Sequence, residues 1–386
     1  MKENNKSKKK KIVMLLTNAF DPDVRVYKEA VYLISKGCDV VILCWDRYTE
    51  SKLPKKEIID GIKIIRFNVP SVAGSGAKQI PAFFKYILCC RRWLKKHKPD
   101  YYHCNDIDGT ITWFLSKSNK APMVFDMHEF YEDYEPKTAL SVFLYRMMTR
   151  FFIKKSIYSL YENNLYLKNN YKSVRDKLVP LKNYPDANLV QYLPKTESDK
   201  FRIGYHGAVR GQIKEFVTLF EAVKGMSDVR VDIHGGGPDL KELKELEKKY
   251  KNVTIHGPFD GTKELTNLYA NSDIVFAGYT QVSKSCECDE MVKFFECIVT
   301  GTPMILTETY KLMAQQINEG GFGIACNTDS VEDVKKAIFK LKDDKEFLKK
   351  CAENERKAAY KYEWNSAVKI LDKVYGLSKG GIKNDI

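Results

Sequence analysis

The sequence predicts an α/β protein built from two parallel-sheet domains, and three observations lead to this expectation. A length of 386 residues exceeds what a single hydrophobic core usually serves. Short continuous apolar runs, such as IVMLL at 12–16, are typical of strands buried on both faces of a sheet. Segments with helical spacing of apolar residues alternate with these runs in both halves of the chain. Such alternation indicates parallel strands joined by right-handed helical crossovers.

The composition indicates a cytoplasmic protein. The ten cysteines show no regular spacing, which favours reduced thiols used for packing over disulfides. Residues 1–11 form a lysine-rich tail, expected to be disordered, that lacks the apolar core of a secretion signal. No later apolar run reaches the roughly 18 residues that span a membrane. Peripheral attachment to the inner face of a membrane is left open.

The charge predicts an acidic partner. The chain has 64 Lys and Arg against 50 Asp and Glu, a formal net charge of +14. Phosphorylated ligands, an anionic membrane surface or a nucleic acid would each suit this surplus. No zinc-finger spacing, basic-zipper pattern or aromatic RNA-binding motif is present, so we expect no nucleic-acid partner.

The first half alternates strand and helix signals. An amphipathic segment at 23–36 ends at Gly37, which is typical of a helix with a left-handed cap. The other elements expected before residue 137 are strands at 12–16, 40–43, 62–67, 101–104 and 123–127, and a helix at 82–96 with a basic end.

Polar residues follow two of these strands. Asp106 and Asp108 could hold a divalent metal on a nucleotide, but Asp108 is more simply read as the start of the next helix, and we favour that interpretation. His128 and Glu129 follow the strand at 123–127 and would lie at the same sheet edge. The alternative for His128 is a partly buried imidazole bonded to a backbone carbonyl.

Residues 138–155 predict a helix of large apolar residues with Arg146, Arg150, Lys154 and Lys155 between them. Such a helix can lie in a membrane interface. It can equally pack under the sheet, which is the default interpretation in a water-soluble domain. Both interpretations stay open.

The second half restarts with a strand at 201–206 that runs into Gly207, followed by Arg210, Lys214 and a helix to Gly225. Glycine lets a backbone approach a pyrophosphate, the helix start supplies free N–H groups, and two cations neutralise the charge. The alternative is that Arg210 and Lys214 form a solvated helix face.

The segment KFFECIVTGTPMI at 293–305 predicts a short helix, a turn and a strand start. Lys293 and Glu296 are three residues apart and therefore share one helix face. A cation and a carboxylate at a sheet edge suit a ligand with both phosphates and hydroxyls. An ordinary amphipathic helix with a solvated ion pair is the alternative.

This segment resembles the donor-site signature of the retaining glycosyltransferases of group one, which have the GT-B fold. The phrase DVRVYKEA at 23–30 and the junction KNYPD at 182–186 are similar to other parts of the family pattern, and the resemblance spans 12–375. It implies two Rossmann-like parallel-sheet domains facing across a cleft. The expected divisions are an N-terminal acceptor-side domain at 12–184, a sugar-nucleotide-binding domain at 185–360, a helix crossing back at 361–378 and a tail at 379–386.

The resemblance also implies roles for individual residues. The reaction would transfer a sugar from a nucleoside diphosphate sugar to a glycan or lipid-linked acceptor, with retention and without a metal or other cofactor. Arg210, Lys214 and Lys293 would stabilise the leaving diphosphate, and His128 would lie beside the transferred sugar. The remaining donor contacts are expected at Gly207, Phe259, Glu290 and Glu296, of which Glu296 would hold the ribose.

The chain departs from the family pattern in three places. Asn18-Ala19-Phe20 replaces a common glycine pair, Ala208 fills a usual arginine position, and Cys288 fills the position of a second glutamate. Zinc at Cys288 and its neighbouring cysteines is improbable, because the spacing is wrong. A sugar-nucleotide epimerase of the same fold and a non-catalytic sugar-nucleotide-binding protein remain alternatives. A Rossmann dehydrogenase is disfavoured, since no G-x-G-x-x-G opens either half.

Overall fold

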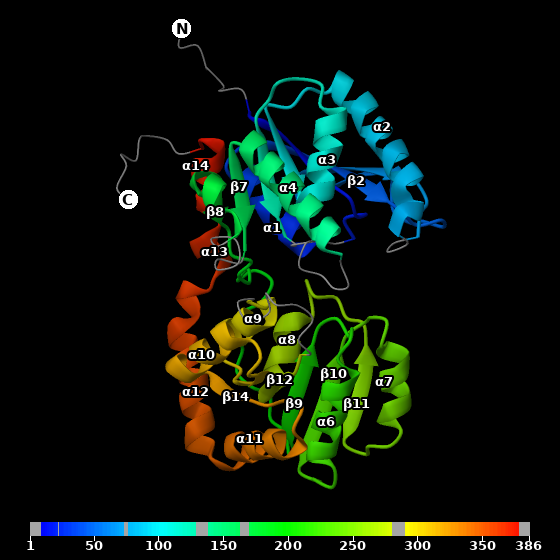
Figure 1. The fold of residues 1–386 in the computed structure, drawn as a ribbon. Helices are drawn as coiled ribbons and strands as arrows, with labels where there is room; N and C mark the ends of the chain where they lie inside the picture. Colours follow the sequence, from blue (N-terminus) through cyan, green and yellow to red (C-terminus); the bar gives the residue numbers. More distant parts are fainter. Residues whose placement is uncertain are drawn as a thin grey trace. The chain divides into compact units, whose positions relative to one another are not determined.

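The computed structural model describes residues 9–21, 23–72, 76–128, 138–162, 170–279 and 290–377. The chain divides into two compact units, the first formed by residues 1–182 with 368–386 and the second by residues 183–367. Each unit contains its own sheet with helices on both faces, as Figure 1 shows. The expected α/β class with two Rossmann-like parallel-sheet domains is confirmed.

The first unit contains an eight-stranded sheet in the order β3-β4-β2-β1-β5-β6-β7-β8. All neighbours are parallel except β3, which pairs antiparallel with β4. Its described elements are β1 (Lys11–Leu16), α1 (Val24–Ser35), β2 (Asp39–Asp46), β3 (Lys56–Ile59), β4 (Ile62–Asn68), η1 (Gly76–Gln79), α2 (Ile80–Lys96), β5 (Tyr101–Asn105), α3 (Asp106–Ser116), β6 (Met123–Met127), α4 (Ala139–Lys155), β7 (Tyr158–Tyr161), η2 (Lys172–Lys177), β8 (Leu178–Pro180) and α14 (Ile370–Tyr375).

The hairpin of β3 and β4 was not predicted, although its turn carries a signal. Asp60 and Gly61 both have positive φ, 49° and 83°, as two-residue hairpin turns require. The antiparallel strand lies at the sheet edge and is largely exposed, so its apolar pattern is weak.

The two faces of the first sheet carry different helices. Helices α2, α3 and α4 pack on one face, where Tyr86, Trp113 and Phe152 join strand residues such as Val13 in the core. Helices α1 and α14 lie on the other face and are joined by an ion pair of 3.3 Å between Lys36 and Asp372. None of the helices in the described ranges combines the length and hydropathy that a bilayer-spanning segment needs.

The second unit contains a six-stranded, fully parallel sheet in the order β11-β10-β9-β12-β13-β14. Alternate strand residues face two separate apolar cores, because successive side chains of a strand point to opposite faces. Its described elements are β9 (Phe201–His206), α6 (Ile213–Val223), β10 (Val229–His234), α7 (Leu240–Glu247), β11 (Val253–Gly257), α8 (Leu265–Ala270), β12 (Ile274–Ala277), α9 (Val292–Thr300), β13 (Met304–Thr307), α10 (Lys311–Gly320), β14 (Gly323–Cys326), α11 (Val331–Asp343), α12 (Lys345–Ala358), η4 (Ala359–Lys361) and α13 (Trp364–Ala367).

Candidate functional site

Glycines allow two turns of the second unit to pack backbone against backbone. Gly207 follows β9 directly, with a φ of 150°, and donates its N–H to the His234 carbonyl, 2.9 Å away. A Cβ on Gly235 would lie 1.9 Å from the Gly207 oxygen, and one on Gly237 would lie 2.1 Å from the Val209 oxygen. Any side chain at these positions would separate the turns. The carboxyl ends of β9 and β10 are thereby held close together.

Lys293 is a buried cation beside this glycine turn. It lies in the first turn of α9, and its Nζ is 3.2 Å from the centre of the Tyr205 ring and 3.4 Å from the place a Cβ on Gly207 would take. Within the described part of the chain, Nζ has no hydrogen-bond acceptor. Burial lowers the pKa of Lys293 to about 7, although the nearby Glu296 opposes this. The site therefore holds a cation whose hydrogen bonds are unmet.

Tyr205 links Lys293 to the start of α6. The tyrosine hydroxyl lies 2.6 Å from the Ala208 carbonyl and 2.7 Å from Oε1 of Gln212, the residue that precedes the helix. The Gln212 side chain does not cap the helix, so the first N–H groups of α6 lack a side-chain acceptor at that position. These groups and the Lys293 ammonium are the donors an anion needs.

Glu296 lies one turn after Lys293 on α9. Its carboxylate is half-buried and accepts a 2.8 Å hydrogen bond from the Tyr269 hydroxyl. Lys293 is buried against the Tyr205 ring, so it does not match the alternative in which Lys293 and Glu296 form an ordinary solvated ion pair. Glu290 is half-buried just before α9, and Phe259 packs on the neighbouring apolar core.

Arg210 and Lys214 are exposed, whereas Lys293 is buried. Lys214 is 68% exposed and pairs with Asp329 at 2.7 Å, a contact that raises its pKa through the hydrogen bond. Arg210 is exposed in the turn that precedes α6. Exposed pairs of this kind are weak, so both side chains are available to an anion at the helix start. The structure places Gly207 against Lys293 and leaves these two cations exposed at the start of α6.

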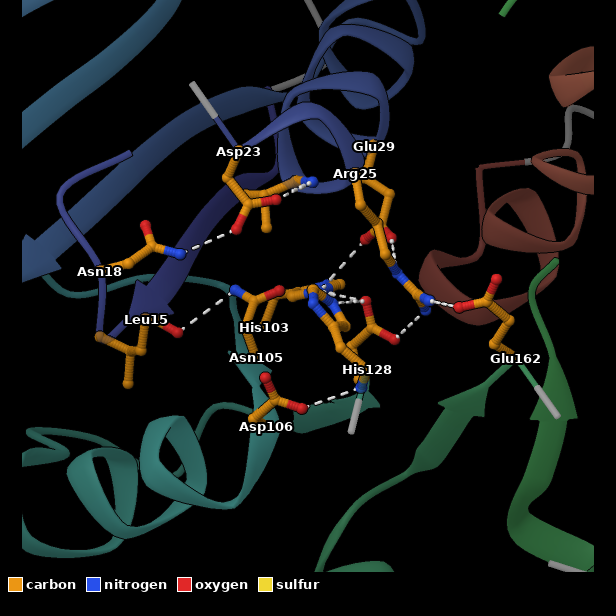
Figure 2. Close-up of polar contacts among 12 residues, drawn as sticks. Leu15, Asn18, Asp23, Arg25, Glu29, His103, Asn105, Asp106, His128 and Glu162 are labelled. Carbon is orange, nitrogen blue, oxygen red and sulfur yellow. Dashed lines mark hydrogen bonds and ion pairs between the residues drawn. The ribbon is translucent and has the colours of Figure 1, made fainter. Parts of the chain in front are cut away.

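His128 belongs to a charged cluster of the first unit, drawn in Figure 2. Its Nε2 lies 2.9 Å from Oδ2 of Asp126, and its backbone N–H donates to Oδ1 of Asp106, also at 2.9 Å. The Arg25 guanidinium contacts Asp126 at 2.6 Å, Glu162 at 3.1 Å and Glu29 at 3.3 Å. His128 is thus held by carboxylates, and within the described ranges no backbone carbonyl is recorded as a partner of its ring.

The cluster keeps His128 protonated at neutral pH. Burial and Arg25 lower its pKa, but Asp126 and Asp106 outweigh them and raise it to about 9. Burial alone would raise the pKa of Asp126, yet Arg25 and His128 hold it well below its usual range. Burial and the neighbouring Asp126 carboxylate raise the pKa of Glu29 well above its usual range. An imidazolium of this kind donates hydrogen bonds and does not act as a base.

Asp106 has a backbone conformation that a non-glycine residue rarely adopts. Its φ is 57°, and it begins α3, while its side chain accepts from His128. Residues held in such regions cluster at functional sites. Asp108 lies in the first turn of α3, but the helix begins two residues earlier at Asp106 with Asn105 as its N-cap, so the interpretation of Asp108 as the helix start is off by two residues. Glu129, Cys286 and Cys288 lie outside the described residues.

Sequence reasoning missed Arg25, Asp126, His103 and Tyr375. His103 Nδ1 lies 2.6 Å from the Tyr375 hydroxyl of α14, and its Nε2 lies 3.5 Å from Asp126 Oδ2. One signal was available, because Asp126 interrupts an otherwise apolar strand and needed a buried partner. No local signal could pair His103 with Tyr375, 272 residues later, since only the fold brings them together.

Three side chains of this cluster could hold a metal ion. Ligand atoms of Glu29, Asp126 and His128 lie within 4.8 Å of one another. The residues fit a metal poorly. The Arg25 guanidinium already contacts the carboxylates of Glu29 and Asp126, and the His128 imidazole beside Asp126 is protonated at neutral pH. A cation would have to displace two positive charges.

Comparison with known proteins identifies the family. The model for glycosyl transferases group 1 matches residues 194–358, and that for the glycosyl transferase 4-like domain matches residues 22–156. A search of the curated proteins by sequence finds no match.

Solved structures agree on the fold. A sucrose-phosphate synthase from Thermosynechococcus elongatus superposes with a TM-score of 0.77 at 14% identity, covering 95% of this chain and 98% of that one. Anabaena HepE in complex with UDP-glucose gives 0.66 at 13%, covering 95% and 99%. WaaG, a glycosyltransferase involved in lipopolysaccharide biosynthesis, gives 0.63 at 15%, covering 95% and 100%. The two matched models and the shared two-domain fold show that this chain belongs to the group 1 glycosyltransferases of the GT-B fold.

Proposed function

We propose that the protein transfers a sugar from a nucleoside diphosphate sugar to an acceptor, with retention at the anomeric carbon. The observation that carries the proposal is the Lys293 ammonium, which is buried beside Gly207 and has no hydrogen-bond acceptor in the described part of the chain. A buried cation without a partner is costly, and an anionic ligand would remove that cost. The diphosphate of a sugar nucleotide supplies such an anion, and HepE is described in complex with UDP-glucose.

The chemistry follows from the charges at this site. As the bond between the anomeric carbon and the phosphate oxygen breaks, negative charge develops on the leaving diphosphate. Lys293, the N–H groups at the start of α6, and Arg210 with Lys214 would stabilise that charge. The acceptor hydroxyl forms the new bond on the same face and gives its proton to the leaving phosphate oxygen. This route needs no enzyme carboxylate as base and tolerates Cys288.

The other residues would orient the substrates. We assign Glu296 to the ribose hydroxyls, because its carboxylate is fixed by Tyr269 and keeps acceptor capacity. We assign the contacts with the base and the donor sugar to Phe259 and Glu290. We assign His128 to the sugar hydroxyls, as a protonated donor. We propose that no metal takes part, since Arg25 and His128 already balance the carboxylates of the first-unit cluster.

We further propose that the product is a cell-surface polysaccharide or glycolipid made in the cytoplasm from a glycan or lipid-linked acceptor. The support is the likeness in fold to WaaG, which is described as involved in lipopolysaccharide biosynthesis.

A thermal-shift screen tests the donor site. Full-length protein is heated with a panel of nucleoside diphosphate sugars, and a ligand that prefers the folded state raises the melting temperature. We expect a shift with at least one donor, and its loss in Lys293→Met and Glu296→Ala. Equal shifts in both variants and the parent would contradict the site.

Product analysis then tests the reaction. The donor that gives the largest shift is incubated with and without acceptor pools, and the anomeric configuration is read by NMR. Transfer with retention supports the proposal. Conversion of the donor sugar without acceptor would show an epimerase, and donor binding without turnover against every pool would show a non-catalytic binding protein.

A further inference from the structure

The two stretches of chain that connect the units run side by side inside the second unit. The chain enters this unit at residue 183 and leaves it after residue 367. The N–H of the buried Trp364 donates to the Pro185 carbonyl at 2.8 Å, and the rings of Tyr184 and Tyr362 lie 5.7 Å apart, edge to face. We call residues 183–192 and 356–367 the connecting segments.

A pocket of about 260 Å³ lies between the connecting segments. Its lining includes the apolar residues Pro185 and Val190 from the first segment and Ala359 from the second, and Val299 of α9 completes it. Sites for drug-sized ligands usually measure roughly 300–1,000 Å³. This pocket, which we call the connector pocket, therefore suits a ligand of about one ring.

The connector pocket adjoins the carboxyl end of α9. Gly301 caps this helix with a φ of 61°, and a Cβ on Gly301 would lie 2.8 Å from Cγ of Arg356 in α12. Lys293 lies six residues before Val299 on the same helix, roughly 9 Å along its axis. Neither Lys293 nor Glu296 lines the pocket. The connector pocket is thus a separate site at the opposite end of the helix that carries these two residues.

The polar residues of the pocket carry opposite charges that do not pair. Arg356 Nη1 donates to the Tyr192 hydroxyl at 3.1 Å, and the guanidinium carbon lies 5.0 Å from the centre of the Tyr192 ring. Glu363 and Gln191 line the same pocket. Among the described residues, neither the Glu363 carboxylate nor the Gln191 side-chain amide has a hydrogen-bond or ion-pair partner. The pocket thus offers a cationic donor, an anionic acceptor and an amide that does both.

These groups favour an uncharged ligand that carries several hydroxyls. A hydroxyl can donate to Glu363 and accept from Arg356, whereas an anion would be repelled by the first and a cation by the second. The apolar part of the lining suits C–H groups. A pyranose ring has both kinds of surface, with hydroxyls around its edge and C–H groups on its faces.

We propose that the connector pocket binds a pyranose ring, supplied either by a free sugar or by the end of a glycan chain. The bound ring would join the two connecting segments to each other and to the carboxyl end of α9. Sugar binding at this pocket does not depend on the proposed transferase activity, so each can fail without the other.

Hydrogen exchange of the full-length protein, measured by mass spectrometry, locates the site. The probes are the methyl glycosides of glucose, galactose, mannose and N-acetylglucosamine. At least one probe should slow exchange in residues 183–192 and 356–367, because a ligand of the folded state opposes local opening. The trisaccharide of the same sugar distinguishes the two sources. Tighter binding of the trisaccharide shows recognition of a glycan end, and equal binding shows recognition of a free sugar; either result supports the proposal.

Titration calorimetry with the best probe measures the contribution of each polar group. Glu363→Ala and Arg356→Met should each raise Kd roughly 10- to 100-fold, the range for hydrogen bonds to charged groups. Ala187 also lines the pocket and is exposed, so Ala187→Leu should weaken binding by filling the space while every polar group stays in place.

Matched controls change the same kinds of residue on α12 outside the pocket. Glu353 is half-buried, as Glu363 is, and Lys349 is exposed, as Arg356 is. Neither control residue lines the pocket. Glu353→Ala and Lys349→Met should therefore bind the probe as the parent does. Melting curves show that each variant is folded.

Each outcome decides the proposal. Slower exchange in the connecting segments, with weaker binding in the three pocket variants and unchanged binding in both controls, supports it. It is overturned if no probe slows exchange there, or if pocket and control variants bind equally. Slowing confined to residues around Gly207 and Lys293 would place the sugar at the donor site and overturn it. Slowing by free arginine or glutamate but by no sugar would show a charged ligand, which also overturns it.

Discussion

The Lys293 ammonium lies 3.2 Å from the centre of the Tyr205 ring. The ring face attracts the cation, but it cannot replace the hydrogen bonds that water would supply. Gly207 also adjoins the ammonium, since a Cβ at that position would lie 3.4 Å from Nζ. The glycine and the buried lysine together favour a ligand that brings its own negative charge.

Replacing Lys293 by Met should stabilise the ligand-free protein at pH 7 to 9. The unfolded lysine keeps its proton up to about its ordinary pKa of 10.5, whereas the folded one loses it above about 7. The unfolded state therefore binds more protons between these values, and stability rises with pH across this window. The buried charge costs about 1.4 kcal/mol for each pKa unit of the shift. In urea unfolding, the free energy of unfolding of the parent should be larger at pH 10 than at pH 7. Lys293→Met should lack this increase. An identical gain in both proteins would contradict this account.

Donor binding at pH 8 should take up protons. Lys293 is mostly neutral there, since its pKa is about 7, and a bound diphosphate would favour the ammonium form. Titration calorimetry in two buffers of different ionisation enthalpy measures the uptake, which should approach one proton per site. Lys293→Met provides the control and should show none. If the measured binding enthalpy is the same in both buffers, the diphosphate does not bind at Lys293.

Glu296→Ala should weaken donor binding and leave turnover at saturation nearly unchanged. A charge-assisted hydrogen bond to a hydroxyl is worth about 1.5–3 kcal/mol, or roughly 10- to 100-fold in Kd. Tyr269→Phe is the matched control, because it removes the 2.8 Å bond to Glu296 but keeps the carboxylate. Tyr269→Phe should weaken donor binding less than Glu296→Ala does. Steady-state kinetics separate KM from kcat, and a fall in kcat alone would oppose the assignment.

Asp126→Asn should lower the pKa of His128 from about 9 towards its ordinary 6.5. A histidine with a raised folded pKa adds stability that is complete below 6.5 and is lost as pH rises through 9. The Asp126→Asn variant should lose this pH dependence of the free energy of unfolding. NMR titration of the imidazole measures the shift directly. Asp60→Asn, which changes a carboxylate bonded to Tyr27, should leave the titration unchanged.

Gly235→Ala should unfold or strongly destabilise the second unit. The new Cβ would lie 1.9 Å from the Gly207 carbonyl oxygen, and backbone atoms must then move. We expect a loss of at least about 3 kcal/mol, the range of severe strain and overpacking. Gly261→Ala is the control, because its nearest neighbour is the Phe259 ring at 3.8 Å. It should change the free energy of unfolding by less than about 1 kcal/mol. Chemical denaturation measures both.

Local patterns predicted most of the elements in this chain. The strand at 12–16 became Lys11–Leu16, and the helix at 138–155 became Ala139–Lys155 with Thr138 as its N-cap. The helix at 23–36 became Val24–Ser35, capped by Asp23. These segments follow from periodicity and capping, which involve residues close in sequence. The antiparallel strand Lys56–Ile59 was missed because it is short and exposed at the edge of its sheet.

The sequence by itself determined the α/β class, the parallel sheets and the position of Lys293 and Glu296 on one helix, because each depends on residues within a few turns of one another. Only the tertiary structure decided that Lys293 rests on Tyr205, that Asp126 joins Arg25 to His128, and that Phe143 faces solvent while Phe152 faces the core. Burial and charge pairing depend on which strands and helices are neighbours. That choice involves contacts across the whole unit, and no short pattern records it.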